Sequence, residues 1–235
     1  MSDSKPPFNF LGLSPEIRLL IYHHVLSGII YVNLRQDEPG CITSFKADIG
    51  DYRYKTLTPA IIRTCKQICH EVAPILYSRN SFLLSPRLFI DWLDTIGPVN
   101  VKYLRYLKVF VPPMYTVEKP NKMRGPPPGK DRPTDWYAVL NELGREATNL
   151  RLVTIEWQAN VRHGEYGGGK DMELVRCLGT LHVEKLTLAG FYARHWPDYL
   201  RAQMGQAIVV EMPPHNDLMA RRLREFQEGT EDLVP

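Results

Sequence analysis

Residues 104–109 read LRYLKV, and the same spacing of aliphatic residues returns at 150–155 (LRLVTI) and at 183–188 (VEKLTL). Each segment is short and β-prone, and a helical pattern precedes the second and the third of them, at 136–147 and 172–181. Strands that alternate with helices in this way form parallel sheets with right-handed crossovers. The sequence therefore predicts an α/β fold with a small parallel sheet covered by helices.

These segments also resemble the strand of leucine-rich repeats, L-x-x-L-x-L. Their separations exceed the roughly 20–29 residues of regular repeats, and the Asn/Cys ladder position is not filled, so the repeat is degenerate. A further strand is predicted at 207–212, at an edge of the sheet. We expect one repeat-like region over 86–212, with an exposed proline-rich loop at 112–134, and then a helix and tail at 213–235.

The N-terminal part has a different pattern. Pro15 follows Ser14 as the first helical residue. The apolar residues that recur after it predict an amphipathic helix of about three turns: Ile17, Leu20, Ile21, Val25 and Leu26. Two β-prone segments at 29–34 and 42–47 predict a strand pair. A second helix is expected from Thr58 onwards. The range 8–85 is thus predicted to be a helical region with an inserted strand pair.

Composition limits the classes of protein that fit. Hydrophobic residues make up 44% and charged residues 23% of the 235 positions, which excludes wholesale disorder. A net charge of +3 gives no reason to expect nucleic acid or anionic membrane as a partner. No apolar run approaches the ~18 residues of a membrane span. The first residues are polar, and the four cysteines have no disulfide-framework spacing, so we expect an intracellular protein, cytoplasmic or nuclear.

Two motifs suggest binding chemistry at first sight. Residues 164–170 fit G-x-x-x-x-G-K, the phosphate-binding loop, but Asp171 stands where magnesium ligation needs Ser or Thr. We interpret the segment as a glycine-rich turn with Asp171 near a helix start. Cys65, Cys69 and His70 provide only one ligand pair, whereas zinc needs four ligands. Both cysteines fall on the apolar stripe of their helix, so we expect them to be buried structural residues.

Catalytic signatures are not found. The sequence has no G-x-S-x-G, H-E-x-x-H or G-x-G-x-x-G motif, and the carboxylates of Asp91, Asp94 and Glu156 are scattered. We therefore expect no catalytic, metal-binding or cofactor-binding residue and no cofactor. Convergence of Glu156, His163 and Lys170 in one pocket would reopen the case for an enzyme.

Three motifs together resemble a large family of F-box-like proteins of filamentous fungi. Residues 10–22 (FLGLSPEIRLLIY) are similar to the family's opening helix, L-P-P-E-I-R-x-x-I-Y. Residues 62–77 (IRTCKQICHEVAPILY) resemble its L-R-T-C-R-Q-I-Y-x-E-A-x-P-x-L-Y helix, and 80–82 its x-x-N-x-F. Residues 96–98 and then 104–109 resemble its I-G-x-x-N-x-x-x-I-R-x-L-x-I segment. The resemblance covers about residues 8–112.

This resemblance implies a binding module. An F-box docks onto the Skp-type adaptor of a cullin ubiquitin ligase, and the domain that follows holds a protein substrate. The residues nearest the adaptor would be Leu13, Pro15, Ile17, Leu20 and Ile21. These residues would equally serve a buried helix, and for Ile17 and Ile21 that reading is at least as good.

The leading hypothesis is a substrate-recognition subunit of a cullin-type ubiquitin ligase. The alternative is a non-catalytic intracellular interaction scaffold that has lost adaptor binding. The strand pair within 29–57 favours the alternative, because an F-box is contiguous. A contiguous exposed apolar patch on the first helix would favour the adaptor, because monomers rarely leave large apolar patches uncovered.

Overall fold

The computed structural model describes residues 8–26, 29–34, 42–48, 55–56, 59–84, 86–111, 133–157, 167–206, 208–214 and 216–232. The strands in these ranges are β1 (Ile29–Leu34), β2 (Ile42–Asp48), β3 (Lys55–Thr56), β4 (Ser81–Leu84), β5 (Tyr106–Val111), β6 (Leu152–Trp157), β7 (Lys185–Gly190) and β8 (Val209–Glu211). The α-helices there are α1 (Pro15–Leu26), α2 (Lys66–Arg79), α3 (Pro86–Val101), α4 (Pro133–Glu146), α5 (Met172–Gly179), α6 (Trp196–Met204) and α7 (Asp217–Glu228). Three short 3₁₀ helices are η1 (Phe10–Gly12), η2 (Pro59–Arg63) and η4 (Gly167–Lys170).

The eight strands form one sheet in the order β3-β2-β1-β4-β5-β6-β7-β8. The five strands from β4 to β8 run parallel to one another, so the predicted mixed α/β architecture with a parallel sheet is confirmed. The predicted strand pair forms as antiparallel β1 and β2. The sheet is larger than predicted, because β1 also pairs in parallel with β4. Sequence reasoning missed β4, since Asn80 and Ser81 resemble a helix exit rather than the start of a strand.

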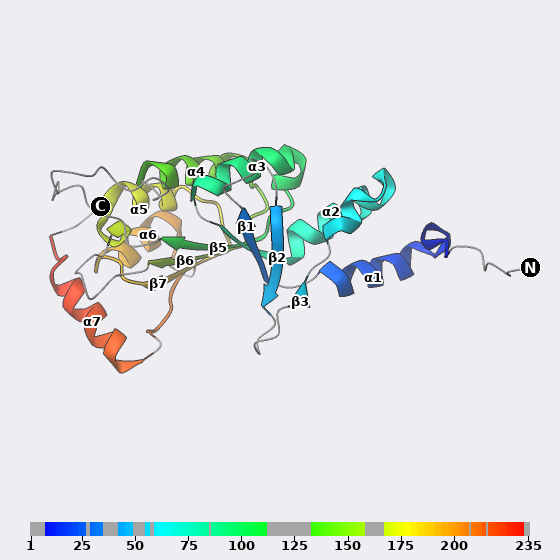
Figure 1. Cartoon of the computed structure of the whole chain (residues 1–235). Helices are drawn as coiled ribbons and strands as arrows, with labels where there is room; N and C mark the ends of the chain where they lie inside the picture. The colour runs from blue at the N-terminus through cyan, green and yellow to red at the C-terminus, as the bar shows by residue number, and fades with distance from the viewer. Residues whose placement is uncertain are drawn as a thin grey trace, which may run out of the picture.

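Helices α3 to α6 lie side by side along one face of the sheet (Figure 1). They connect successive strands from β4 to β8, so strand order follows chain order. In β6 the alternate residues Val153, Ile155 and Trp157 are buried, while the residues between them are partly exposed. This two-residue period is what a strand needs when one face packs on helices and the other does not.

The core lies between this sheet face and the helices. It contains all four tryptophans of the chain, each almost fully buried: Trp92, Trp136, Trp157 and Trp196. Trp157 packs edge-on against Trp196 at a ring-centroid distance of 5.5 Å, and Phe89 packs likewise against Trp92 at 5.6 Å. These rings and the surrounding aliphatic side chains bury the apolar surface that stabilises the unit formed by β4 to β8.

The two ends of the molecule differ in how they join this unit. Helices α1 and α2 extend beyond the β1–β3 edge, and α7 lies near the β8 edge (Figure 1). Because β4 pairs with β5, the sheet is continuous across the predicted boundary between 85 and 86, and the division into regions stays a prediction. The predicted loop at 112–134 lies outside the described residues up to 132, and α4 begins at Pro133. In the described part of the chain, no helix is long and apolar enough to cross a membrane.

Candidate functional site

The first helix begins with a local hydrogen-bonding arrangement that orients its N-terminus. The Asn9 side chain accepts a hydrogen bond from the Gly12 amide at 3.2 Å and so caps η1. Pro15 then opens α1, where its missing N–H costs nothing, and the Arg18 amide donates to the Ser14 carbonyl at 3.1 Å. The N-terminus of α1 is thereby fixed by residues of the first motif.

The buried side of α1 contains only part of the apolar pattern of this helix. Its buried residues are Arg18, Tyr22 and Leu26, spaced four residues apart. Ile17 and Leu20, which were expected to be able to serve as core residues, are 46% and 65% exposed. The sequence left open whether these two residues belong to the core, and their exposure shows that they do not; the side of α1 that contacts α2 has Arg18 and Tyr22 instead.

That contact is a hydrogen-bonded cluster centred on Glu71 of α2. The Arg18 guanidinium donates to both Glu71 oxygens, from Nε at 3.0 Å and from Nη2 at 2.7 Å. The Tyr22 hydroxyl donates to Glu71 Oε2 at 2.8 Å, and Gln67 Nε2 donates to Oε1 at 3.0 Å. The Arg18 guanidinium, with help from Gln67 and Tyr22, lowers the pKa of the Glu71 carboxyl to about 2. Glu71 is therefore ionised at neutral pH and holds α1 against α2.

The same guanidinium also orders the segment before α1. Arg18 Nη1 donates to the Leu13 carbonyl at 2.6 Å and to the Leu11 carbonyl at 3.2 Å. At the other end of the helix, buried Asn80 donates from Nδ2 to the Leu26 carbonyl at 2.6 Å and to the Leu76 carbonyl at 2.7 Å. Both ends of α1 are thus attached to α2 and its C-cap by side chains that have their polar atoms paired.

Sequence reasoning did not predict this cluster. Arg18 and Tyr22 lie in the first motif, and Gln67 and Glu71 lie in the second. Neither motif by itself indicates that the two pairs of side chains meet. One signal could have found the link: an arginine and a tyrosine spaced i, i+4 in one motif, and a glutamine and a glutamate with the same spacing in the other. The four side chains can satisfy one another only if the two helices pack together.

Several apolar side chains of α1 are exposed to solvent. We give the name α1 apolar surface to the exposed apolar residues of α1 together with those of the segment before it: Phe8, Leu11, Ile17, Leu19 and Leu20. Ile17 and Leu20 are three residues apart and share the outward side of the helix. Of the other residues expected near an adaptor, Pro15 is exposed, whereas Leu13 and Ile21 are half-buried.

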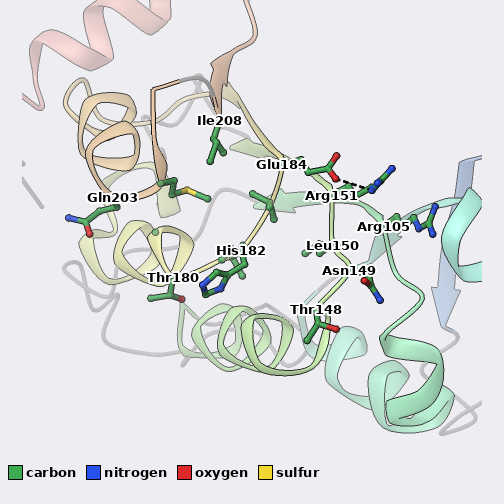
Figure 2. A pocket seen from close by; sticks show the side chains of 14 residues that line it. Arg105, Thr148, Asn149, Leu150, Arg151, Thr180, His182, Glu184, Gln203 and Ile208 are labelled. Atoms are coloured by element: carbon green, nitrogen blue, oxygen red, sulfur yellow. Dashed lines mark ion pairs between the residues drawn. The ribbon is translucent and has the colours of Figure 1, made fainter.

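A second candidate site is a groove at the amino ends of the parallel strands. It has a volume of about 690 Å³ and lies where β5, β6, β7 and β8 begin and where α4, α5 and α6 end. Figure 2 shows Arg105 and the Arg151–Glu184 ion pair toward one end, and Thr180 and Gln203 toward the other. We call it the amino-edge groove. Sequence reasoning did not single it out, because its residues come from the four connections before β5, β6, β7 and β8, which only the fold brings together.

The glycine-rich segment 164–170 plays a structural part where the structure describes it. Gly169 is buried, and a Cβ on it would lie 1.9 Å from the Phe191 carbonyl oxygen, so no larger residue fits. Lys170 lies over the Phe226 ring at 5.5 Å, and Asp171 caps α5 by accepting from the Glu173 and Leu174 amides at 3.1 Å. The expected position of Asp171 near a helix start is confirmed, and the lysine is engaged with an aromatic ring.

The two cysteines differ from expectation. Cys65 is exposed and is the N-cap of α2, because the helix begins at Lys66 rather than at Thr58. Cys69 is half-buried. The prediction of two buried cysteines is therefore wrong for Cys65 and only partly right for Cys69. Among the described residues, no three His, Cys, Asp or Glu side chains gather as a metal site would require.

The three residues whose convergence would suggest catalysis are not brought together where the structure describes them. Glu156 pairs with Lys108 across neighbouring strands at 3.2 Å. Lys170 lies on η4 against Phe226, and His163 falls outside the described residues. Asp91 and Asp94 are exposed on α3.

Comparison with known proteins finds no counterpart for this chain: no described protein family, no curated protein and no solved structure matches it. The α1 apolar surface and the amino-edge groove are the two features from which a function can be argued.

Proposed function

We propose that this chain is a non-catalytic substrate-recognition subunit of a cullin-type ubiquitin ligase that docks a Skp-type adaptor through α1. The observation that carries the proposal is the exposure of Leu20 and Ile17 on the outward side of that helix. Large apolar side chains grouped on one exposed face are typical of an interaction site. The family resemblance of residues 10–22 points to the same helix.

The way α1 is held supports a docking role. Glu71 and Asn80 fix both ends of the helix, so its outward side is already ordered before a partner arrives. A preordered surface binds more tightly, because less conformational entropy is lost on association. Leu20 at the centre of this side has the character of an interface hot spot, being large, apolar and removed from water only in a complex.

The rest of the chain suits the part of such a subunit that holds a substrate. From β4 to β8, strands and helices alternate and all four connecting helices lie on one face of the sheet, as they do in a leucine-rich-repeat protein. We therefore infer that residues 86–212 form a degenerate leucine-rich-repeat-like unit that carries the substrate-binding surface. We also place the protein inside the cell, where the ligase operates.

The test is a pull-down of the full chain with a purified Skp-type adaptor at micromolar concentration. The decisive variant is Leu20→Asp, which puts a charge on an exposed position and should leave folding intact. The matched control is Leu218→Asp on α7, where the leucine is also exposed, at 56%, but lies near the other end of the sheet. Circular dichroism and melting temperature establish that both variants are folded.

We expect the wild type and the Leu218→Asp variant to bind the adaptor and the Leu20→Asp variant to lose binding. Absence of binding by the wild type would overturn the proposal. The resemblance to F-box proteins would then reflect the fold alone, and a scaffold that has lost its adaptor would be the better description. Equal binding by all three chains would mean that α1 is not the docking helix.

A further inference from the structure

The amino-edge groove is built from equivalent residues of successive strand–helix units. The Arg105 carbonyl accepts hydrogen bonds from the Arg151 and Leu152 amides at 2.9 Å, and the Arg151 carbonyl accepts from the Glu184 and Lys185 amides at 2.9 Å. These bonds place Arg105, Arg151 and Glu184 next to one another along the edge where β5, β6 and β7 begin. Each of the three occupies the second position of its strand motif.

The charges along this row are not balanced. Arg151 Nε lies 3.0 Å from Glu184 Oε1, so these two side chains neutralise each other. Arg105 is exposed, and in the described part of the chain no carboxylate lies within ion-pair distance of its guanidinium. One end of the groove therefore carries an uncompensated positive charge (Figure 2).

The remainder of the groove is lined by both polar and apolar side chains. Val183, Met204 and Ile208 line it and are half-buried, with part of each side chain open to solvent. Gln203 lines the groove and can donate and accept hydrogen bonds, whereas the Thr180 hydroxyl already donates to the Cys177 carbonyl at 2.8 Å and can only accept. A volume of about 690 Å³ lies in the roughly 300–1,000 Å³ range of sites that enclose a small ligand or a few residues of a peptide.

The surrounding helices decide which kind of anion fits. Helices α4, α5 and α6 all end at the groove, and a helix C-terminus carries a partial negative charge. A free inorganic anion would meet these carbonyl ends and would gain only one guanidinium. A carboxylate attached to an apolar side chain gains the guanidinium and also buries apolar surface against Met204 and Ile208, which offsets that repulsion.

From this combination we propose that the amino-edge groove binds an acidic protein segment, with an Asp or Glu carboxylate on Arg105 and a nearby aliphatic or aromatic side chain on Val183, Met204 and Ile208. Binding of such a segment does not require the adaptor. The further statement that the segment belongs to a ligase substrate rests on the proposed function.

The experiment selects a phage-displayed library of random linear decapeptides on the full-length chain and measures the enriched peptides by fluorescence anisotropy. The variant Arg105→Glu reverses the charge at an exposed position and should fold normally. The matched control is Arg224→Glu, the same charge change on α7, which is anchored through Phe226 packed on Phe191 after the end of β7. Melting temperatures of both variants establish folding.

We expect enriched peptides that carry Asp or Glu within a few residues of Leu, Ile or Phe. Their affinity should fall at least about tenfold with the Arg105→Glu variant, stay unchanged with Arg224→Glu, and weaken with added salt. Absence of enrichment would overturn the proposal, as would enriched peptides without acidic residues or equal affinity for the Arg105→Glu variant. The Leu20→Asp chain should keep peptide binding and the Arg105→Glu chain should keep adaptor binding, so each proposal can fail without the other.

Discussion

In the unit from β4 to β8, aliphatic side chains and tryptophans point inward and charged residues face solvent, whereas in α1 an arginine lies inside and Leu20 lies outside. The helices α3 to α6 are therefore held by apolar burial. The α1 helix adds an ion pair and hydrogen bonds to α2 to the apolar burial of Tyr22 and Leu26. The comparison teaches that an apolar pattern can misidentify the buried side of a helix. It does so when a polar side chain of that helix forms an ion pair or hydrogen bonds with the helix that it packs against.

The largest expected effect lies in the strand unit. Leu188 of β7 is fully buried in the main core, and Leu188→Ala would leave a cavity there. We expect a loss of about 3 kcal/mol in the free energy of unfolding, measured by urea denaturation. A loss below about 1 kcal/mol would mean that apolar packing around Leu188 contributes little to the stability of the strand unit.

A smaller and more local effect is expected at the α1–α2 contact. Glu71→Ala removes the carboxylate on which the Arg18 guanidinium and the Tyr22 hydroxyl both depend. We expect hydrogen exchange of α1 amides to rise at least about tenfold while exchange in β6 stays unchanged. Glu156→Ala, which breaks a partly exposed pair with Lys108 on the sheet, is the matched control and should not affect α1. An equal rise in hydrogen exchange in α1 and in β6 would mean that the two regions do not open independently.

Acid should release the same contact without a mutation. The pKa of Glu71 is lowered from its ordinary 4.5 to about 2, chiefly by hydrogen bonds from Arg18, so its ionised form contributes stability above pH 4.5. That contribution is lost as the pH falls from about 4.5 towards 2. We expect α1 amide signals in nuclear magnetic resonance spectra to report detachment over this range. A Glu71→Gln chain, which has no carboxyl to protonate, should lack this pH-dependent step, and its persistence there would contradict the assignment.

The smallest effect is expected on the outward side of α1. Leu20→Ser replaces a side chain that is 65% exposed, so we expect a change within about 0.5 kcal/mol in the free energy of unfolding. The contrast with Leu188→Ala separates a leucine kept for stability from one available for binding. Thermal unfolding of the two variants side by side measures it. A large destabilisation by Leu20→Ser would show that this leucine is packed in solution.

Much of the fold followed from sequence. Aliphatic spacing predicted three strands at 104–109, 150–155 and 183–188 and the helices before the last two, and the structure has these strands two residues later, at 106–111, 152–157 and 185–190. The short strand β4 was not predicted, since four residues after a helix carry too little pattern. Because β4 was not predicted, the pairing that joins β1 to the rest of the sheet was not predicted either.

The candidate sites were predictable to different degrees. Two residues of the α1 apolar surface, Ile17 and Leu20, were named from a motif, but the contact that turns them outward involves Glu71, which lies 53 positions after Arg18. The amino-edge groove was not foreseen at all. Arg105 and Arg151 were visible in the strand motifs, yet their position at a common edge follows only from the register of β5 and β6. Local patterns contain no information about which distant loops come together.

The double hydrogen bond of Asn80 has a consequence for the order in which the chain folds. Its partners are the carbonyls of Leu76, four positions away, and Leu26, 54 positions away. Contacts over such long separations form late, because a large loop must close first. During synthesis α1 leaves the ribosome before any of its partners exist, and it can dock only once Asn80 has emerged. The α1 helix is therefore made well before it can be positioned, and its leucines are accessible to other proteins throughout that interval.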